Sequence, residues 1–288
     1  MKKNLLLLFT CFTFLSFAKN VPQRAVSASQ FTTEILLSIG AEKQMVGTAF
    51  MDNEILPELQ EKFAKIPVLS KKYPSKEIFY SINPDFLTGW KSAVDPKNLG
   101  SIEELEKNGV QVFFMKSINS NKLEDLFEDI NELGKIFNLE KNAQALVKNM
   151  KTELKEIESS LPTKKIKVFA YDSGEVTPFT IGGTGLENTI ISLAGGDNIF
   201  GDAAGSFPAG NWERVLVSDP DIIVIVDYGT TSAQEKIKFL KESSPIKNSN
   251  AVKNNKFVII GLGDIAPGVR NIKAIKKLAE AFHGRNNL

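Results

Sequence analysis

The chain has 288 residues, with 35 basic and 34 acidic side chains, so its formal net charge at pH 7 is +1. A charge this close to zero does not favour nucleic acid as a partner, and no basic amphipathic stretch indicates binding to a membrane surface. Hydrophobic residues make up 42% of the chain, and its length fits two globular domains of ordinary size.

The first 18 residues have the pattern of a secretory signal peptide. Two lysines precede an apolar run over residues 5–17, and Ser16 and Ala18 provide the small residues of a cut after Ala18. The run is shorter than the roughly 20 residues of a membrane-spanning helix. We therefore expect a periplasmic protein, cleaved near Ala18. The alternative is a lipid anchor on Cys11, the only cysteine, but no small residues precede it within the apolar run.

Residues 19–121 alternate short apolar runs with amphipathic segments, which predicts a first α/β lobe. Ser101 and Glu104 have the spacing of a capping box at the start of a helix. The expected strands are 25–28, 45–48, 85–88 and 110–115, and the expected helices include 30–39 and 76–82.

Residues 122–160 have a helical pattern throughout, with a gap near Asn138 that divides two helices. The α/β rhythm resumes over 161–288, which predicts a second lobe. Thr184 and Glu187 form a second candidate capping box. The expected strands of this lobe are 166–171, 221–226 and 256–260, and its helices are 186–194, 212–217, 233–240 and 271–282.

An internal repeat relates the two lobes. Glu77 precedes Pro84-Asp85 with the same spacing that separates Glu213 from Pro220-Asp221, and each copy runs from a short helix into an apolar strand. A second echo pairs 35–39 and 46–47 with 189–193 and 200–201. We therefore predict two similar α/β lobes joined by a long helical connection. Such lobes present binding groups at the carboxyl ends of their strands, which predicts a ligand cleft between them.

Several short motifs in a fixed order carry a resemblance to a known family. The sequence resembles the substrate-binding components of ABC importers for iron-siderophores, haem and cobalamin, in the class with a single long helix between the lobes. The resemblance covers essentially the whole mature chain. The motifs are Arg24-Ala25-Val26-Ser27, Thr33-Glu34-Ile35-Leu36, Asn83-Pro84-Asp85, Asp219-Pro220-Asp221, Ala194-Gly195-Gly196 and Pro267-Gly268-Val269-Arg270.

The resemblance implies a monomer that captures a small molecule and delivers it to an ABC permease with its separate ATPase subunit. It implies a metal chelate as ligand, an iron-siderophore first and haem or a corrinoid as alternatives, and no cofactor of the protein's own. Tyr171-Asp172-Ser173-Gly174 and Thr177-Pro178-Phe179 are similar to segments of members proposed to bind a deazaflavin cofactor precursor. A non-iron organic ligand is therefore a further alternative.

Glu77 and Glu213 are the candidate docking residues. In the resembled family, a glutamate on each lobe docks to arginines of the permease, and both positions match. A structural explanation competes, because an acidic side chain in the first turn of a helix interacts favourably with the helix dipole, by about 0.3 to 1 kcal/mol. The dipole does not explain why the acid recurs at matched positions in both lobes.

Trp90 follows the strand expected at 85–88 and is the first candidate for ligand contact. A flat aromatic ring can pack on a macrocycle or a chelate ring. The alternative is that it covers the core of its lobe. Trp212 is its counterpart in the second lobe, but it adjoins Glu213 at a helix start, where a packing role competes.

Lys91, Arg24 and Arg270 are the candidate basic groups, because a ligand with a carboxylate or phosphate needs at least one cation. Each is equally consistent with a solvated surface charge. Arg270 is the strongest of the three, since it follows the turn Pro267-Gly268 at the start of the last helix, where a cation does not serve the dipole.

Asp172, Ser173 and Tyr228 are the candidate polar contacts of the second lobe. They lie at the ends of the strands expected at 166–171 and 221–226, where an α/β sheet presents its binding groups.

The sequence offers little for catalysis or for a metal site of the protein's own. It has one histidine, His283, and no cysteine after residue 18, which argues against zinc clusters and most nucleophile–base pairs. The glycine-rich segment 182–185 lacks the pattern of a nucleotide-binding loop. We therefore predict a binding protein and no enzyme. A secreted hydrolase that uses Asp172 or Asp264 is the competing hypothesis.

Overall fold

The computed structural model describes residues 21–284. The predicted signal peptide and Cys11 lie outside this range. The first lobe is built around a parallel sheet whose spatial order is β3 (Val68–Ser70), β2 (Met45–Ala49), β1 (Ala25–Ala28), β4 (Phe86–Gly89) and β5 (Gln111–Phe113). Its helices are α1 (Gln30–Ile39), α2 (Gln60–Phe63), α3 (Lys76–Ser81) and α4 (Ile102–Lys107).

The second lobe has a central strand β6 (Ile166–Ser173), flanked on one side by β9 (Ile222–Asp227) and then β10 (Phe257–Gly261). Two short strands pair with β6 as well: β8 (Gly196–Asn198) in parallel and β7 (Phe179–Thr180) antiparallel. The helices are α7 (Leu186–Leu193), α8 (Trp212–Ser218), α9 (Ala233–Glu242), α10 (Asn250–Lys253), α11 (Leu262–Ile265) and α12 (Asn271–His283).

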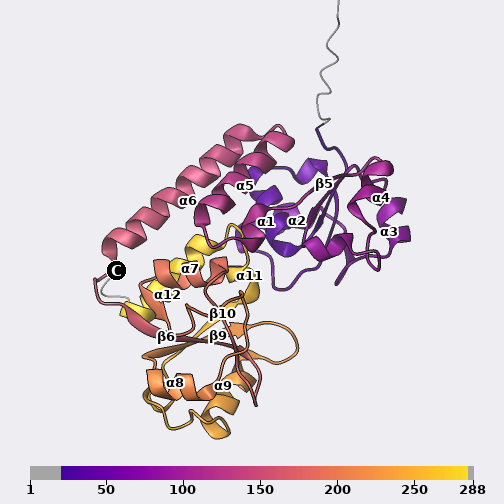
Figure 1. The fold of residues 1–288 in the computed structure, drawn as a ribbon. Helices are drawn as coiled ribbons and strands as arrows, with labels where there is room; N and C mark the ends of the chain where they lie inside the picture. Colours follow the sequence, from indigo (N-terminus) through magenta and orange to yellow (C-terminus); the bar gives the residue numbers. More distant parts are fainter. Residues whose placement is uncertain (1–20, 285–288) are drawn as a thin grey trace, which may run out of the picture.

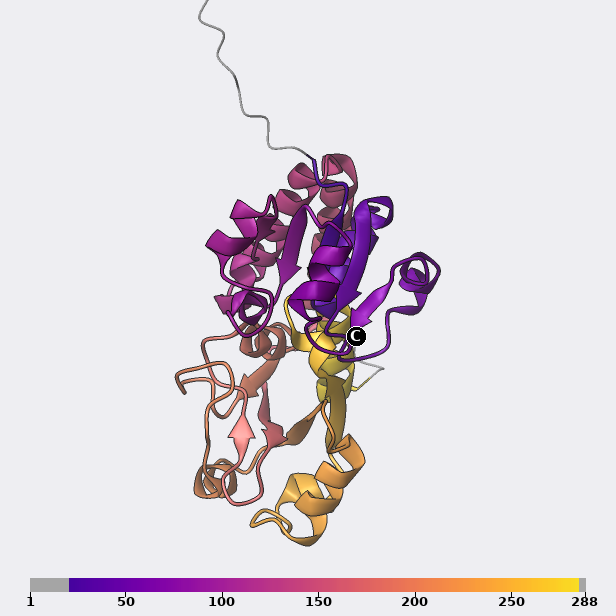
Figure 2. The same cartoon turned by 90° about the vertical axis from the view of Figure 1, so that its right-hand side faces the viewer.

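The two lobes share one strand order. The parallel strands β8, β6, β9 and β10 of the second lobe follow the order of β2, β1, β4 and β5 in the first. Figures 1 and 2 show the first lobe, indigo to magenta, above the second, salmon to yellow. This arrangement confirms the predicted fold class of two similar α/β lobes.

The repeat read from the sequence corresponds to a repeated turn. Asn83 and Asp219, each directly before a proline, have left-handed backbones with φ of 45° and 42°. The aspartate after each proline then fastens the neighbouring strand: Asp85 accepts the backbone N–H of Arg24 at 2.9 Å, and Asp221 accepts that of Lys167 at 2.8 Å. In both lobes, the same carboxylate contact therefore links the amino end of the central strand, β1 or β6, to the amino end of its neighbour, β4 or β9.

Two helices connect the lobes, as the sequence predicts. They are α5 (Leu123–Ile136) and α6 (Glu140–Ser160), separated at Asn138, which has a φ of 57°. Gly134 permits their close approach, because a Cβ there would lie 2.4 Å from the Cβ of Ala143. The long helix α6 packs against α1 and α5 of the first half and α12 of the second, and it runs along one side of the molecule (Figure 1).

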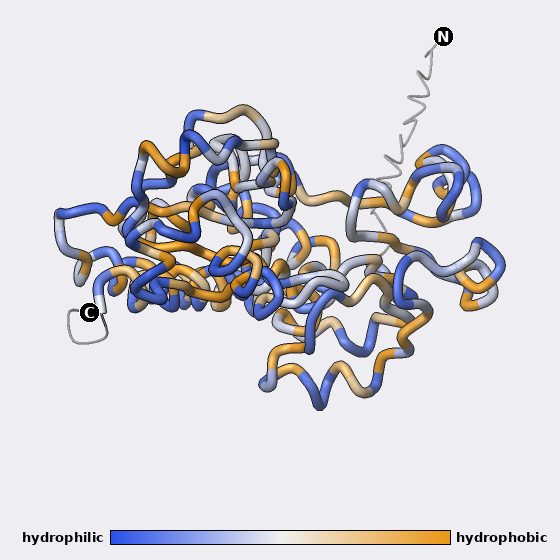
Figure 3. The backbone as a smooth tube through the Cα atoms, turned by 90° about the horizontal axis from the view of Figure 1, so that it is seen from below, coloured by the Kyte–Doolittle hydropathy of each residue, from blue (hydrophilic) through white to orange (hydrophobic). Residues whose placement is uncertain are grey.

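One cluster of buried apolar side chains extends through both lobes and the helical connection. It includes Phe86 of the first sheet, Phe137 after α5, Val168 of the second sheet and Ile275 of α12. In Figure 3, hydrophobic segments run through the interior, and hydrophilic and hydrophobic stretches alternate along the outer turns. Among residues 21–284, no helix is long and apolar enough to cross a membrane.

The structure corrects three local predictions. Ser101 caps α4 as expected, but the Glu104 side chain pairs with Lys76 at 2.9 Å and does not complete a capping box. The predicted box at Thr184 is wrong, because α7 has Gly185 at its N-cap without a side-chain bond. In the second echo, residues 200–201 lie beyond β8, whereas 46–47 lie within β2, so only its helical half matches.

Glu187 lacks the capping partner that the sequence predicted for it, and its position predicts a pH-dependent effect on stability. Burial raises the pKa of its carboxyl, and its Oε2 is buried with no hydrogen-bond partner within residues 21–284. A carboxyl whose pKa is raised in the folded state destabilises the fold as pH rises above its unfolded value. We expect Glu187→Gln to raise Tm at pH 7.5 by about 2 to 4 °C, for roughly 1 kcal/mol.

Thermal denaturation at pH 7.5 and pH 4 tests this prediction, since the gain should shrink at pH 4, where the carboxyl is mostly protonated in both states. Glu124→Gln is the matched control. Glu124 is also the second residue of a helix, but it is exposed, so its replacement removes only a favourable dipole interaction. An equal gain in both variants, or a gain that does not depend on pH, would contradict the role of burial at Glu187.

Candidate functional site

The two sheets place aromatic residues at equivalent points. Trp90 directly follows β4, and Tyr228 directly follows β9, which has the same position in the second sheet. Both side chains are half-buried and pack against the cluster that extends through both lobes. The carboxyl ends of parallel strands are where α/β sheets bind ligands. The predicted contact residues therefore lie at the expected edge of each sheet.

In the second lobe, the structure brings three predicted residues into one hydrogen-bonded group. Asp172 is the penultimate residue of β6, and only 4% of it is exposed. Its Oδ2 accepts the Tyr228 hydroxyl at 2.9 Å and the Ser173 hydroxyl at 2.8 Å. Its Oδ1 is buried and has no partner among the residues that the structure describes. We call these three residues the acceptor cluster.

Lys236 of α9, which is 4% exposed, is an electrostatic neighbour of the acceptor cluster. Its Nζ donates to the carbonyl of Val226 at 2.6 Å and lies 4.7 Å from the ring centroid of Tyr228. Burial lowers the pKa of Lys236, although Asp172 and Asp227 oppose the shift. Burial, followed by the bond to Asp172, raises the pKa of Tyr228 to about 12. Tyr228 is therefore protonated at neutral pH and donates to Asp172.

A pocket of about 310 Å³ borders this group. Two of its lining residues belong to these surroundings: Ser173 bonds to Asp172, and Lys236 lies over the ring of Tyr228. The turn after β6 and the first turns of α9 complete its walls, with Gly174, Glu175, Thr231 and Glu235 among the lining residues. The carboxyl edge of the second sheet thus has both a hollow and a set of oriented polar groups.

Trp90 and Lys91 are at the corresponding edge of the first lobe. The Trp90 ring meets the Phe31 ring edge to face, with centroids 4.7 Å apart. Phe31 is buried, and a Cβ added to Gly268 of the second lobe would lie 3.3 Å from its Cβ. Lys91 is exposed, and its side chain has no hydrogen bond or ion pair with any residue from 21 to 284. The first lobe therefore offers an aromatic surface and an available cation.

Arg270, the strongest predicted cation, is engaged by the protein itself. It is 8% exposed and pairs with Glu34, which is 1% exposed and belongs to α1 of the first lobe. Its Nε lies 2.7 Å and its Nη2 lies 2.5 Å from the two carboxylate oxygens of Glu34. The same guanidinium bonds to the carbonyl of Glu54 and, at 3.3 Å, to Asp264. The structure thus places Arg270 in a junction between the lobes.

Other polar contacts extend this junction. Gln30, buried at the start of α1, accepts the N–H groups of Asp52 and Asn53 through its amide oxygen. Asn53 in turn accepts the N–H of Gly263 at 3.0 Å across the lobes. Neither Gln30 nor Glu34 was predicted from the sequence to have a functional role. The signal available in the sequence was Glu34 itself, an acid in α1 directly before the apolar residues 35–37.

Two residues considered from sequence lie elsewhere. Arg24 precedes β1, at the amino edge of the first sheet, and its guanidinium bonds to the carbonyls of Ile82 and Asn83. A role at the carboxyl edge is therefore wrong for Arg24. Trp212 is buried, donates its indole N–H to the carbonyl of Glu175 at 3.0 Å, and packs among aromatic rings, so the packing explanation holds.

Glu77 and Glu213 occupy the same position in equivalent helices. Each is the second residue of its helix, α3 or α8, after an N-cap whose side chain accepts a backbone N–H: Ser75 in α3 and Asn211 in α8. Both glutamates are exposed, and within residues 21–284 neither carboxylate has a hydrogen-bond or ion-pair partner. Figure 1 shows the two helices on different lobes, well apart from one another. Two matched carboxylates are thus presented to solvent, one per lobe.

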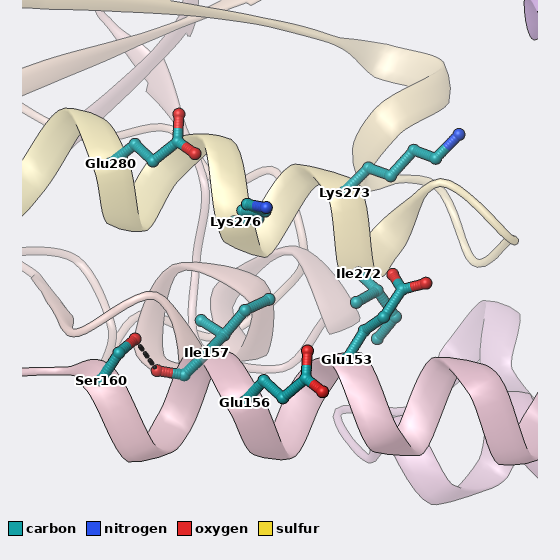
Figure 4. Close-up of a pocket in the computed structure, with 8 residues that line it drawn as sticks. All are labelled: Glu153, Glu156, Ile157, Ser160, Ile272, Lys273, Lys276 and Glu280. Atoms are coloured by element: carbon teal, nitrogen blue, oxygen red, sulfur yellow. Dashed lines mark hydrogen bonds between the residues drawn. The ribbon is translucent and has the colours of Figure 1, made fainter. Parts of the chain in front are cut away.

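A further groove of about 350 Å³ lies between α6 and α12 (Figure 4). Acidic side chains of α6, Glu153 and Glu156, line one wall, and Lys273 and Lys276 of α12 line the other. Lys273 also pairs with Glu58 of the first lobe. None of these residues is at the end of a strand, so the groove is separate from the carboxyl edges. Within residues 21–284, no group of three or more His, Cys, Asp or Glu side chains is arranged to hold a metal ion.

Comparison with known proteins assigns the family. The family model described as periplasmic binding protein matches residues 26–261, which include both sheets and their helical connection. The chain belongs to the periplasmic binding protein family. A periplasmic binding protein from Veillonella parvula has 37% sequence identity and a TM-score of 0.86, with 92% of this chain and 93% of that chain covered.

More distant matches are named as vitamin-binding, heme-binding or transporter substrate-binding proteins. The vitamin B12-binding protein of Vibrio parahaemolyticus is 21% identical, over 98% of this chain and 97% of its own length. The uncharacterized ABC transporter substrate-binding lipoprotein YvrC of Bacillus subtilis is 25% identical, over 92% and 81%. The periplasmic heme-binding protein HutB of Vibrio cholerae has a TM-score of 0.75 at 22% identity, over 91% and 99%. At these identities, the structural likeness concerns the fold of this periplasmic binding protein.

Proposed function

We propose that this periplasmic binding protein is the solute-binding component of an ABC importer. It captures a metal chelate between its lobes, an iron-siderophore in the first instance, and delivers it to a membrane permease driven by an ATPase subunit. The observation that supports this most strongly is the pair Glu77 and Glu213, exposed and unpartnered within residues 21–284 at matched helix positions. A function within one lobe would not need the same carboxylate on both.

The carboxyl edges supply the binding groups in this proposal. Trp90 packs against a flat face of the ligand, and Lys91 offers a charge on the same lobe. Asp172, Ser173 and Tyr228 form the polar contacts of the other lobe. Arg270 has a different role here, because its bonds to Glu34 hold the lobes at a fixed junction. The lobes close on the ligand by a limited motion around this junction and α6.

Haem and corrinoids remain in the proposed ligand class, since relatives of this fold are named for heme and for vitamin B12. A deazaflavin-like cofactor precursor is the non-iron alternative. The proposal includes export to the periplasm with cleavage near Ala18, and a monomer that binds without catalysis. A secreted hydrolase is disfavoured because Asp264 pairs with Arg270 and Asp172 is committed to two hydroxyl groups.

Native mass spectrometry and absorbance spectra of the mature protein from its own host test this function. We expect one small molecule to be bound per chain, with the absorbance of an iron or cobalt chelate. A colourless organic ligand would agree with the importer function, but the solute would then not be a metal chelate. Conversion of an added ligand to a product would overturn the proposal in favour of an enzyme.

A further inference from the structure

The direction of the hydrogen bonds in the acceptor cluster limits what the second lobe can bind. Asp172 is a carboxylate and only accepts, so the hydroxyls of Tyr228 and Ser173 must both point their protons at its Oδ2. Each hydroxyl has one proton. With that proton used, the outward side of each oxygen has only lone pairs. The cluster therefore presents acceptors and no donor.

The second oxygen of Asp172 strengthens this conclusion. Oδ1 is buried and has no partner among the described residues, although the adjacent Oδ2 has two. Buried polar atoms are nearly always hydrogen-bonded, and an ionised one without a partner costs more than a neutral one. A group that satisfies Oδ1 must bring an N–H, an O–H or a positive charge.

The two buried cations of the described residues each bond to groups of the protein. Lys236 and Arg270 are the buried basic side chains of residues 21–284. Lys236 donates to the carbonyl of Val226, and burial lowers its pKa. Arg270 donates to Glu34, Glu54 and Asp264. A carboxylate of the ligand placed at Asp172, Ser173 and Tyr228 would thus meet lone pairs and a negative charge, and the neighbouring buried ammonium of Lys236 already gives one of its three protons to Val226.

We propose that the second lobe recognises hydrogen-bond donors of the ligand, such as carboxamide N–H or hydroxyl groups, through Asp172, Ser173 and Tyr228, and discriminates against ligands that present carboxylates there. This inference rests on the proposed function, because it assumes that the solute binds at the carboxyl edges of the sheets. It narrows the ligand class to donor-bearing chelates or cofactors. Sites built to pair with a ligand N–H or O–H discriminate strongly against groups that cannot donate.

Asp172→Asn is the decisive substitution. The asparagine carbonyl replaces Oδ2 as acceptor for the two hydroxyls, and the amide NH₂ then occupies the position of Oδ1. The change converts an acceptor into a donor without a change in size. Asp227→Asn is the matched control, since it removes the same charge from the end of β9, where Asp227 accepts the N–H of Ala233.

Equilibrium dialysis of the mature chain with four probes tests the proposal. Cyanocobalamin, ferrioxamine B and riboflavin present amide or hydroxyl donors, whereas haemin presents propionates. We expect a donor-bearing probe to bind at least about tenfold more tightly than haemin. Asp172→Asn should lower the affinity for that probe by about tenfold or more, and Asp227→Asn should change this affinity by less than about twofold. If Asp172→Asn lowers Tm, Tyr228→Phe provides the second variant. It should lower the affinity for the same probe several-fold.

The outcomes separate this inference from the function on which it rests. Tighter binding of haemin than of the donor-bearing probes would overturn the inference and leave the importer function intact. Equal effects of Asp172→Asn and Asp227→Asn would also overturn it, because charge alone would then explain the loss. If none of the four probes binds to the wild-type chain, the proposed ligand class fails, and the inference fails with it.

Discussion

Reversal of charge at both Glu77 and Glu213 should reduce uptake of the ligand by at least about tenfold, while its affinity for the isolated protein stays unchanged. Both carboxylates are exposed and belong to no hydrogen bond or ion pair within residues 21–284, so Glu77→Lys with Glu213→Lys breaks no described contact in either lobe. If the permease offers arginines at these points, each lysine creates like-charge repulsion at the interface, which costs several kcal/mol. Uptake of the identified ligand by cells that lack the wild-type chain measures the effect.

The matched control reverses Glu103 and Glu124 to lysine. These residues are also exposed and are also the second residues of helices, α4 and α5. Their reversal changes the net charge equally and loses the same dipole interaction, about 0.3 to 1 kcal/mol for each helix. Uptake should persist in the control. Equal uptake by the two double variants would show that Glu77 and Glu213 have no docking role.

Replacement of Arg270 by methionine should lower the free energy of unfolding by about 3 to 5 kcal/mol, because one partner of a buried ion pair is then left without compensation. Glu34 is 1% exposed and accepts from Arg270 through both carboxylate oxygens. The variant also loses the bond to the carbonyl of Glu54. Denaturant-induced unfolding of the mature chain, followed by circular dichroism, provides the measurement.

The double variant Glu34→Met with Arg270→Met separates the cost of an unpaired charge from the value of the pair. Replacing both members of a buried ion pair by apolar side chains is often neutral or stabilising. We expect the double variant to recover most of the stability that Arg270→Met loses. Additive losses would instead show that Glu34 and Arg270 stabilise the junction through independent contacts.

Much of the fold followed from local sequence. The helix over residues 30–39 was predicted with the bounds that α1 has, and the strand over 221–226 differs from β9 by one residue at each end. Their periodicity and caps act between near neighbours in the chain. The matched Pro-Asp turns also indicated the repeat, because one backbone geometry requires similar residues in both lobes. The short strands β3, β7 and β8 were missed, since two or three residues contain no periodic signal.

The candidate site was also predicted only in part from the sequence. The sequence by itself placed Asp172, Ser173 and Tyr228 at a common sheet edge, because the ends of parallel strands meet there. Only the tertiary structure showed that both hydroxyls donate to one oxygen of Asp172 and that the other oxygen is unpaired within residues 21–284.

Arg270 shows most clearly what local sequence patterns do not predict. Its position at the start of the last helix was read correctly from the sequence, but its partner Glu34 lies 236 residues earlier, in the other lobe. Local patterns report the conformation of a segment and the face that it buries. Which charges meet across two lobes depends on how the lobes pack, and for this protein only the tertiary structure decided that Arg270 joins the lobes.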